Sequence, residues 1–285
     1  MNQTKSTQMR SWLFTPATRP DRFAKAAASG ADVRIIDLED SVAPADKAKA
    51  RQTALGYLTQ PAAGSCGRAL RMNGLETCFG LADLQALLES SACPDYLVLP
   101  KTESAAHLQI LDRLLAESGK ASRLVALIES ARGLAACETI AASTPRLEAL
   151  LFGAADMSAD LGAGTAWAQL AYARSRLIAA CALAGILAID SPFFDVKDHE
   201  GLTLETTEAI ALGFAGKAAI HPNQIAPINA ALTPSPDAVA HARAILAENA
   251  KGVGVVQGQM VDEAVARKAR SILAAAGETI QNKPL

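Results

Sequence analysis

Two acidic residues of this chain end separate apolar runs, where their side chains could share one chemical task. Glu129 ends the run LVALIE, and Asp156 ends LEALLFGAAD. Two carboxylates without a neighbouring Cys or His suit a hard divalent ion such as Mg2+, which fills its octahedron with water and substrate oxygens. An ion pair with Arg or Lys is the alternative interpretation for either acid.

A basic residue at the end of another apolar run suggests oxyanion chemistry. Arg71 ends the run RALR, and its guanidinium could bind a carboxylate bidentately or stabilise a developing oxyanion. The alternative is an internal ion pair with Asp37 or Glu39, which share one face of an earlier strand by alternation. The two interpretations are compatible, because an acidic neighbour would hold the arginine side chain in place.

Two further polar residues follow apolar runs in the same way. Lys101 after YLVLP could bind an anion, or form a Schiff base if it is desolvated. His221 after KAAI is more typical of a hydrogen-bonded structural residue than of a general base, and we interpret it as structural.

The elements that must position these residues are short apolar strands separated by helix-length segments. Continuous apolar runs are typical of strands buried on both faces, as in a parallel sheet covered by helices. Eight strands are predicted, over residues 11–16, 33–39, 68–73, 95–100, 123–129, 147–153, 186–190 and 217–222. Reactive residues gathered at strand ends are typical of the active face of a (β/α)8 TIM barrel, an α/β fold.

The domain organisation follows from the same pattern. We expect a disordered tail over residues 1–10, the barrel over 11–232 and a C-terminal helical lid or arm over 233–285. The segment TPSPD marks the junction, and two helices then flank a Gly-rich extended stretch, KGVGVVQGQMVDE. This C-terminal part is too small for an independent core. We therefore expect it to pack as a lid or as a subunit arm.

Composition argues against several classes of protein. The formal net charge is −2 and no basic stripe is present, which disfavours nucleic acid or an anionic membrane surface as partner. No apolar stretch approaches the length of a membrane span, and the first ten residues lack the apolar middle of a signal peptide, so a cytoplasmic location is expected. The five cysteines are scattered without metal-binding spacing, as expected for reduced thiols.

A series of motifs, in order along almost the whole chain, resembles one protein family. They are SWLFTPATRPDRFAKA, DVRIIDLEDSVAPADKAKAR, RMNG, VLPKTES, ALIESARGL, FGAADMSADLG, GFAGKAAIHPNQI and GQMVDE. Together they resemble the citrate lyase beta subunit family, which includes malyl-CoA and citramalyl-CoA lyases and belongs to the HpcH/HpaI aldolase group.

The resemblance implies roles for residues of the barrel. It implies Mg2+ held by Glu129 and Asp156, with Arg71 and Glu129 beside the substrate oxygens. In relatives that use CoA thioesters, the positions of Phe14, Arg19 and Lys25 contact the cofactor, which is why these three are predicted as CoA-binding residues.

The resemblance also implies a role for the C-terminal part. Asp262 aligns with an acid that relatives insert into the active site of a neighbouring subunit, which implies a homo-oligomer, a trimer or hexamer. Gln259 stands where a Lys is frequent, and TPAT replaces the usual Pro-Gly turn after the first strand.

The function implied is that of a Mg2+-dependent carbon–carbon lyase. It would cleave a 3-hydroxyacyl-CoA thioester of the citramalyl-CoA or malyl-CoA type to a 2-keto acid and acetyl-CoA. The expected partners are therefore a small-molecule CoA thioester or 2-keto acid. The main alternative is the beta subunit of a citrate lyase complex, acting on a citryl acyl carrier. A silent barrel that only binds a partner and an aldolase for free keto acids are the further alternatives.

Overall fold

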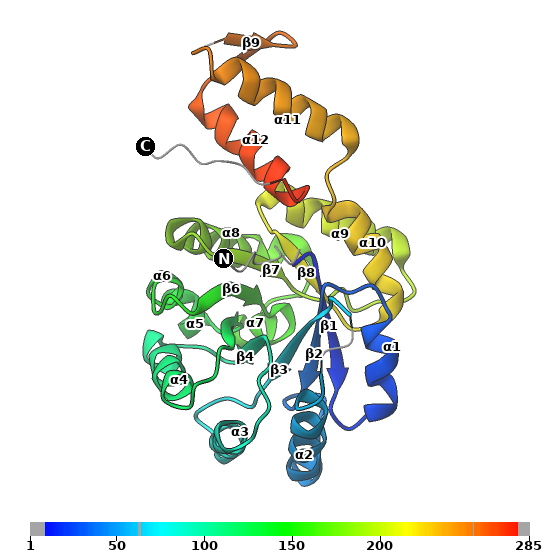
Figure 1. Cartoon of the computed structure of the whole chain (residues 1–285), viewed down its shortest axis with the longest axis vertical. Coiled ribbons are helices and arrows are strands. Elements are labelled where there is room, and N and C mark those ends of the chain that lie inside the picture. Colours follow the sequence, from blue (N-terminus) through cyan, green and yellow to red (C-terminus); the bar gives the residue numbers. More distant parts are fainter. Residues whose placement is uncertain (1–8, 62–63, 253, 279–285) are drawn as a thin grey trace. The chain divides into compact units, whose positions relative to one another are not determined.

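A closed barrel of eight parallel strands forms the larger of two compact units in the computed structural model, which describes residues 9–61, 64–252 and 254–278. This unit spans Met9–Ile228 (Figure 1). The strands are β1 (Ser11–Pro16), β2 (Val33–Asp37), β3 (Gly67–Arg71), β4 (Tyr96–Leu99), β5 (Arg123–Ile128), β6 (Leu147–Phe152), β7 (Leu187–Asp190) and β8 (Gly216–Ala219). Each strand pairs with the next along the chain, and β8 pairs with β1 to close the barrel. The predicted barrel fold is confirmed.

Helices follow the strands and surround the barrel (Figure 1). They are α1 (Phe23–Ala27), α2 (Lys47–Leu58), α3 (Cys78–Glu89), α4 (Ala105–Glu117), α5 (Ala131–Ala135), α6 (Cys137–Ala141), α7 (Ala154–Leu161), α8 (Trp167–Ala184), α9 (His199–Leu212) and α10 (Ile225–Leu232). Residues 157–161, at the start of the Gly-rich segment MSADLGAGT, continue α7. That helix buries Met157 and ends at Gly162, whose φ of +63° suits a left-handed cap.

Apolar side chains fill both faces of the strands. One face forms a cluster inside the barrel, and it consists of Trp12, Val33, Ile35, Ala69, Val98, Val125, Leu127, Ala149, Leu151, Ile189 and Ala218. The alternate residues pack outward against the helices. Burial on both faces is the reason that the strands read as continuous apolar runs in the sequence.

Charged residues are buried between the short strands β7 and β8 and the helices that cover them. β7 and β8 pair through only two residue pairs. There the carboxylate of Asp190 accepts hydrogen bonds from Lys217 Nζ at 2.6 Å and from Arg174 Nε of α8 at 3.0 Å. Lys217 also donates to Glu205 of α9 at 2.8 Å. Asp190 and Lys217 are both 0% exposed, so this strand-end acid belongs to the packing between barrel and helices.

The second unit begins at Asn229, within α10, and contains two helices and a hairpin. Its elements are α11 (Pro236–Asn249), β9 (Gly254–Val256), β10 (Gln259–Val261) and α12 (Glu263–Ala275). Ala242 and Ile245 of α11 pack with Leu273 of α12. Both turn residues of the hairpin, Gln257 and Gly258, have positive φ, as a two-residue turn requires.

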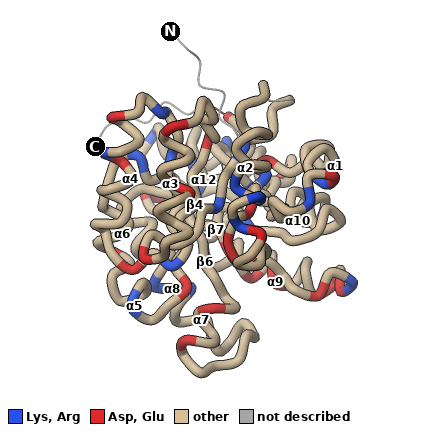
Figure 2. The backbone as a smooth tube through the Cα atoms, turned by 90° about the horizontal axis from the view of Figure 1, so that it is seen from below, with Lys and Arg blue, Asp and Glu red and all other residues tan. Residues whose placement is uncertain are grey.

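Of the expected N-terminal tail, residues 1–8 lie outside the described residues, and Arg10 forms an ion pair with Asp32 at 2.9 Å. Acidic and basic residues are interspersed along the described chain (Figure 2). In the part of the chain that the structure describes, no helix is long and apolar enough to cross a membrane.

Candidate active site

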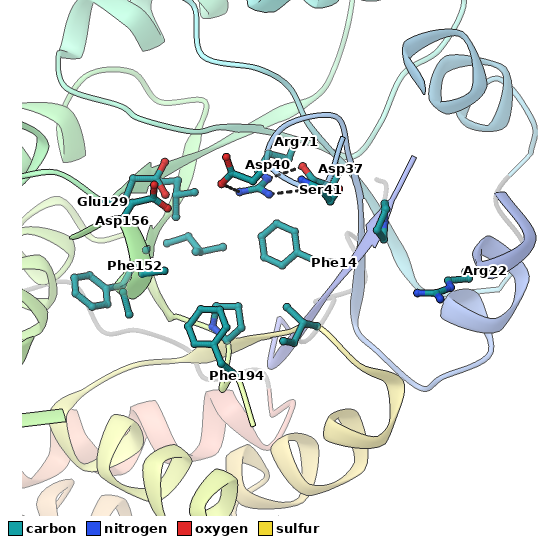
Figure 3. Close-up of a pocket in the computed structure, with 18 residues that line it drawn as sticks. Phe14, Arg22, Asp37, Asp40, Ser41, Arg71, Glu129, Phe152, Asp156 and Phe194 are labelled. Carbon is teal, nitrogen blue, oxygen red and sulfur yellow. Dashed lines mark hydrogen bonds and ion pairs between the residues drawn. The ribbon is translucent and has the colours of Figure 1, made fainter. Parts of the chain in front are cut away.

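A cavity of about 400 Å³ opens among the carboxyl ends of the barrel strands (Figure 3). Its polar lining consists of Arg22, Asp37, Asp40, Ser41, Arg71, Glu129 and Asp156. Its apolar lining includes Phe14, Leu127, Leu151, Phe152, Phe194 and Ile220. The carboxyl ends of barrel strands meet at one face, which is why residues distant in sequence share this cavity.

Arg71 is fixed at the cavity wall by acids at the end of β2 and just after it. Its Nε and Nη2 donate to the two oxygens of Asp37 at 2.6 and 2.8 Å, and Nη1 lies 3.0 Å from Glu39 Oε2. Its guanidinium stacks on the ring of Phe14, 4.7 Å from the centroid. The internal ion pair expected from the sequence is therefore present, and it holds the arginine rather than removing it from the cavity.

Burial and charge act in opposite directions on this pair. Burial opposes ionisation of Asp37, but the charge and hydrogen bonds of Arg71, together with hydrogen bonds from Ser41 and Glu39, hold the pKa of Asp37 below its ordinary value. Burial likewise would lower the pKa of Arg71, but Asp37 and the neighbouring Glu39 and Glu129 together raise it. Both groups stay charged at neutral pH, so Arg71 is a permanent cation in the cavity wall.

Hydrogen bonds from Lys47, a residue that the sequence did not single out, hold the loop after β2 in place. Lys47 is buried, and its Nζ donates to the carbonyls of Leu38 and Glu39 at 3.0 Å each and to Asn73 Oδ1 at 2.6 Å. Asn73 in turn donates its backbone N–H to Asp83 at 2.9 Å. Lys47 lies within the motif DLEDSVAPADKAKAR, but its helical position gave no sign of a role near the cavity.

Glu129 is a buried carboxylate with acidic neighbours. It directly follows β5, is 3% exposed, and its Oε1 accepts a hydrogen bond from the backbone N–H of Lys101 at 2.7 Å. Burial, followed by the charges of Asp156 and Glu39, raises the pKa of Glu129 to about 8. A carboxylate of this kind favours a nearby cation, which would remove the penalty for ionising it.

Asp156 lies beside Glu129 in the cavity (Figure 3). The expectation that it ends a strand was wrong: β6 ends at Phe152, and Asp156 stands in the first turn of α7. Gly153 lies between β6 and α7. It has no room for a side chain, because a Cβ there would lie 2.5 Å from Glu129 Cβ. The glycine thus lets the backbone approach Glu129 closely.

The donor set of the pair fits Mg2+. Among the described residues, no three His, Cys, Asp or Glu side chains gather in an arrangement that could hold a metal ion. Glu129 and Asp156 both line the cavity and would supply two hard oxygen ligands, leaving the other positions to water or substrate oxygens, as Mg2+ prefers. A site for a softer metal would need Cys or His, which the cavity lining lacks.

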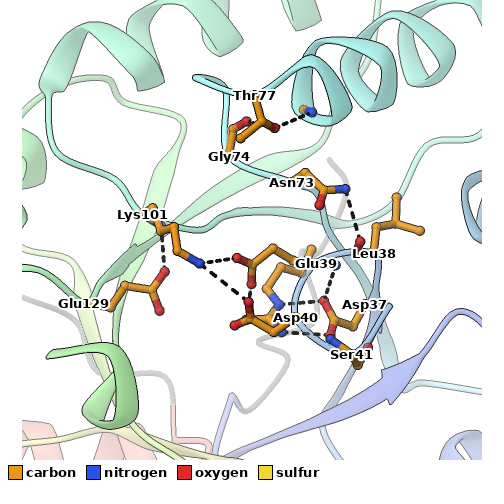
Figure 4. A network of polar contacts seen from close by, with 12 residues as sticks. Asp37, Leu38, Glu39, Asp40, Ser41, Asn73, Gly74, Thr77, Lys101 and Glu129 are labelled. Atoms are coloured by element: carbon orange, nitrogen blue, oxygen red, sulfur yellow. Dashed lines mark hydrogen bonds and ion pairs between the residues drawn. The ribbon is translucent and has the colours of Figure 1, made fainter. Parts of the chain in front are cut away.

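Lys101 is a half-exposed cation paired with acids (Figure 4). Its Nζ contacts Glu39 Oε1 and lies 3.6 Å from Asp40 Oδ1. Burial would lower the pKa of Lys101, but the hydrogen bond and charge of Glu39 outweigh it, so the pKa is raised. A Schiff-base lysine needs a neutral amine at working pH, and this environment argues against that alternative.

A second cavity of about 240 Å³ adjoins the first, since Phe14, Pro16, Arg22 and Ile220 line both. Lys25 also lines this second cavity, whereas Arg19 lines neither of the two and pairs with the exposed Asp21 at 2.7 Å. Arg22, which the sequence analysis did not single out, therefore stands where a basic residue was expected.

His221 caps the short 3₁₀ turn Pro222–Gln224. Its Nδ1 accepts a hydrogen bond from the Asn223 N–H at 3.2 Å, and the side chain of Gln224 accepts from the His221 N–H. These contacts support its interpretation as a structural residue. Asp262 belongs to the second unit, where its side chain caps α12 by accepting from Val265 N–H at 2.9 Å.

The fold and the cavity define a class of protein: a (β/α)8-barrel enzyme with a carboxylate pair and a fixed arginine at the carboxyl ends of its strands. Residues 10–222 match the HpcH/HpaI aldolase/citrate lyase family, and the chain belongs to that family.

Named relatives agree with this family. The chain is 40% identical to the L-malyl-CoA/beta-methylmalyl-CoA lyase of Rhodobacter capsulatus, with 93% of each chain covered. It is 38% identical to the citrate lyase subunit beta-like protein of Mycobacterium tuberculosis, with 94% of this chain and 95% of the other covered. The predicted family and the predicted lyase class are confirmed.

Solved structures extend the comparison to ligands. RipC from Yersinia pestis is 57% identical, with a TM-score of 0.73 over 81% of this chain and 98% of that one. CitE from Mycobacterium tuberculosis, solved with magnesium, acetoacetate and coenzyme A, is 37% identical, with a TM-score of 0.80 over 94% of this chain and 98% of that one. Related Mycobacterium tuberculosis structures hold magnesium together with oxaloacetate or pyruvate, which are 2-keto acids, so the expected Mg2+ and the expected class of keto acid are found in relatives of this chain.

Proposed function

We propose that this protein is a Mg2+-dependent carbon–carbon lyase that cleaves a 3-hydroxyacyl-CoA thioester of the malyl-CoA or citramalyl-CoA type. The products would be a 2-keto acid and acetyl-CoA. The observation that carries the proposal is the carboxylate pair Glu129 and Asp156 in one cavity with the fixed cation Arg71. The relatives' names support the substrate class.

The proposed reaction is a retro-Claisen cleavage. The substrate hydroxyl gives its proton to solvent, and its oxygen forms the carbonyl of the 2-keto acid as the bond between the carbinol carbon and the carbon next to the thioester breaks. The electron pair of that bond leaves as a thioester enolate, which takes up one proton to give acetyl-CoA. Glu129 and Asp156 would hold the Mg2+, which when bound supplies Lewis-acid stabilisation of charge on substrate oxygens.

The cation Arg71 would donate hydrogen bonds to the oxygen on which negative charge develops. Asp37 and Glu39 keep its guanidinium in one orientation, so little reorganisation is needed as the charge appears. Phe14 and Phe194 give the cavity apolar walls, which strengthen these electrostatic contacts by excluding water.

The adjoining cavity would take the CoA portion. Lys25 and Arg22 line it, and their charges suit the phosphates of CoA. Phe14 stands between the two cavities. We retain Phe14 and Lys25 as proposed CoA contacts and add Arg22. Arg19 could join them only by leaving Asp21, its partner on the exposed first turn.

The enolate needs a proton donor, and we propose that Asp262 supplies it. Residues 233–285 would act as a lid that brings Asp262 to the barrel of a neighbouring subunit, in a trimer or hexamer. In the structure the Asp262 carboxylate caps α12, which fixes the backbone around the acid. The cytoplasmic location stays a prediction from the sequence.

The test is a product assay with the purified protein and Mg2+ against malyl-CoA, citramalyl-CoA and citryl thioesters. We expect cleavage of a CoA thioester that chelation of Mg2+ abolishes. Glu129→Gln and Asp156→Asn should each lose this activity together with Mg2+ binding by calorimetry. Undiminished Mg2+ binding in both variants would refute the ligand assignment.

The second candidate function is that of a citrate lyase beta subunit, which the beta-subunit names of several relatives favour. In that case the isolated protein would be inactive on free CoA thioesters and would need an acyl-carrier thioester. Turnover of a free CoA thioester by the protein alone would rule this candidate out.

A further inference from the structure

Lys101 has a left-handed backbone conformation that the local sequence does not explain. It directly follows Pro100 at the end of β4 and has a φ of +48°, in the left-handed region that disfavours residues with a Cβ. Within the described residues the other non-glycine with positive φ is Gln257, and its two-residue hairpin turn requires this conformation. No such turn is present at Lys101, so the strain must be balanced by other contacts.

Those contacts tie the end of β4 to the site. The Lys101 N–H donates to Glu129 Oε1 at 2.7 Å (Figure 4). The following N–H, that of Thr102, donates to the Leu127 carbonyl of β5 at 3.1 Å, and the Thr102 hydroxyl donates to Leu99 O at 2.9 Å. The left-handed residue therefore directs two successive amides at β5 and at the acid that follows it.

The hydrogen bond fixes one end of the Glu129 carboxylate. Oε1 is occupied by the Lys101 amide, while Oε2 accepts no hydrogen bond from the described residues and lies on the side of Gly153. Lys101 does not line the cavity, so it acts on the site through Glu129 rather than by touching a substrate. This separates a positioning role from a catalytic one.

The side chain explains why glycine does not occupy this position. Glycine would adopt a positive φ without strain. It would, however, leave Glu39 without the ammonium that Lys101 supplies, so that Arg71 would be its remaining basic partner.

We propose that Lys101 is a positioning residue whose left-handed backbone sets the orientation of Glu129 for the metal. The proposal rests on the proposed function, because it takes Glu129 as a Mg2+ ligand. It states that Mg2+ affinity depends on the backbone preference of residue 101, separately from the charge of its side chain.

A matched pair of variants tests this. Lys101→Gly and Lys101→Val both remove the ammonium, so the change in local charge is the same in each and cancels in the comparison. Only glycine retains the left-handed conformation without strain, whereas valine is β-branched and opposes it. We expect Mg2+ to bind at least about fivefold more weakly to the Val variant than to the Gly variant in calorimetry.

A second pair protects the result against a fold defect. Lys101→Asn tolerates a positive φ and should bind Mg2+ like the Gly variant, and Lys101→Leu should bind like the Val variant. Melting temperatures and circular dichroism establish that each compared variant is folded. Equal Mg2+ affinity within the pairs would overturn the proposal.

Glu129→Gln separates this proposal from the proposed function. If that variant binds Mg2+ as the wild type does, the ligand assignment fails and the positioning proposal fails with it. If it loses Mg2+ while the Gly and Val variants bind equally, the positioning proposal alone fails.

Discussion

Gly153→Ala should impair the site without unfolding the protein. Gly153 has φ −104° and ψ 87°, a conformation open to alanine, so the backbone does not oppose the change. The added Cβ would lie 2.5 Å from Glu129 Cβ and 2.7 Å from Oε2, where ordinary contacts begin at 3.4 Å. Glu129 must therefore move by about 0.9 Å. Rotation of its side chain cannot remove the clash, because the Cβ position is set by the backbone.

The magnitude follows from this displacement. A misplacement of about 1 Å at a reacting centre can cost about 100-fold in rate. Overpacking costs about 1–3 kcal/mol, and the reduced freedom of the unfolded chain returns about 0.4–1 kcal/mol. We therefore expect turnover of the best CoA thioester to fall about 100-fold, while the melting temperature falls by less than about 10 °C.

The control is the same substitution at a glycine with space around it. A Cβ at Gly164 would meet nothing closer than Gln169 Cγ at 3.8 Å. Gly164→Ala should keep wild-type turnover, measured by release of the 2-keto acid with Mg2+ in excess. Turnover of Gly153→Ala within about threefold of the wild type would refute the reasoning that Glu129 must stay against this backbone.

Three further outcomes are expected. Asp262→Asn keeps a residue that caps helices well, so α12 should stay folded while turnover falls by at least about 100-fold at unchanged Mg2+ affinity; wild-type turnover would remove Asp262 from the mechanism. Arg71→Lys loses the bidentate pairing and should lower kcat by about 100–1000-fold in the same assay, and a change in KM alone would count against an oxyanion role. Burial raises the pKa values of Cys137 and Cys181 to about 12, so both thiols stay protonated at pH 8. At this pH iodoacetamide should label the exposed Cys78, and it should label Cys137 and Cys181 only after unfolding. Intact-mass analysis measures the labelling.

The barrel could be predicted from the sequence because its strands are buried on both faces. Each strand therefore reads as an apolar run, and helix-length spacing between runs implies parallel pairing. Arg71 and Glu129 were found by the same logic, as polar residues at strand ends. Asp156 was correctly expected at the carboxyl ends of the strands, but it lies in α7 rather than at the end of β6. The apolar residues that begin α7 continue the apolar run of β6, so the sequence does not show where the strand ends.

Other parts of the site leave no mark in the sequence. The positive φ of Lys101 follows no glycine or asparagine signal, and the choice of Arg22 over Arg19 depends on the direction of a single 3₁₀ turn, Pro20–Arg22. Lys47 reads as a solvated helical lysine, because its partners are the backbone carbonyls of a loop that the sequence does not locate. These features come from tertiary placement rather than from local pattern.

The buried charges of Asp190 and Lys217 also favour one alignment of β7 with β8. Only two residue pairs join β7 to β8, so backbone hydrogen bonds alone define the alignment of these two strands weakly. Because side chains alternate between faces, a slip of β8 by one residue would turn Ala218 outward and turn the ammonium of Lys217 into the apolar interior that contains Trp12, away from Asp190. An uncompensated buried charge costs about 3–5 kcal/mol. The ion pair between Lys217 and Asp190 therefore stabilises the native alignment of β7 and β8 against this shifted pairing.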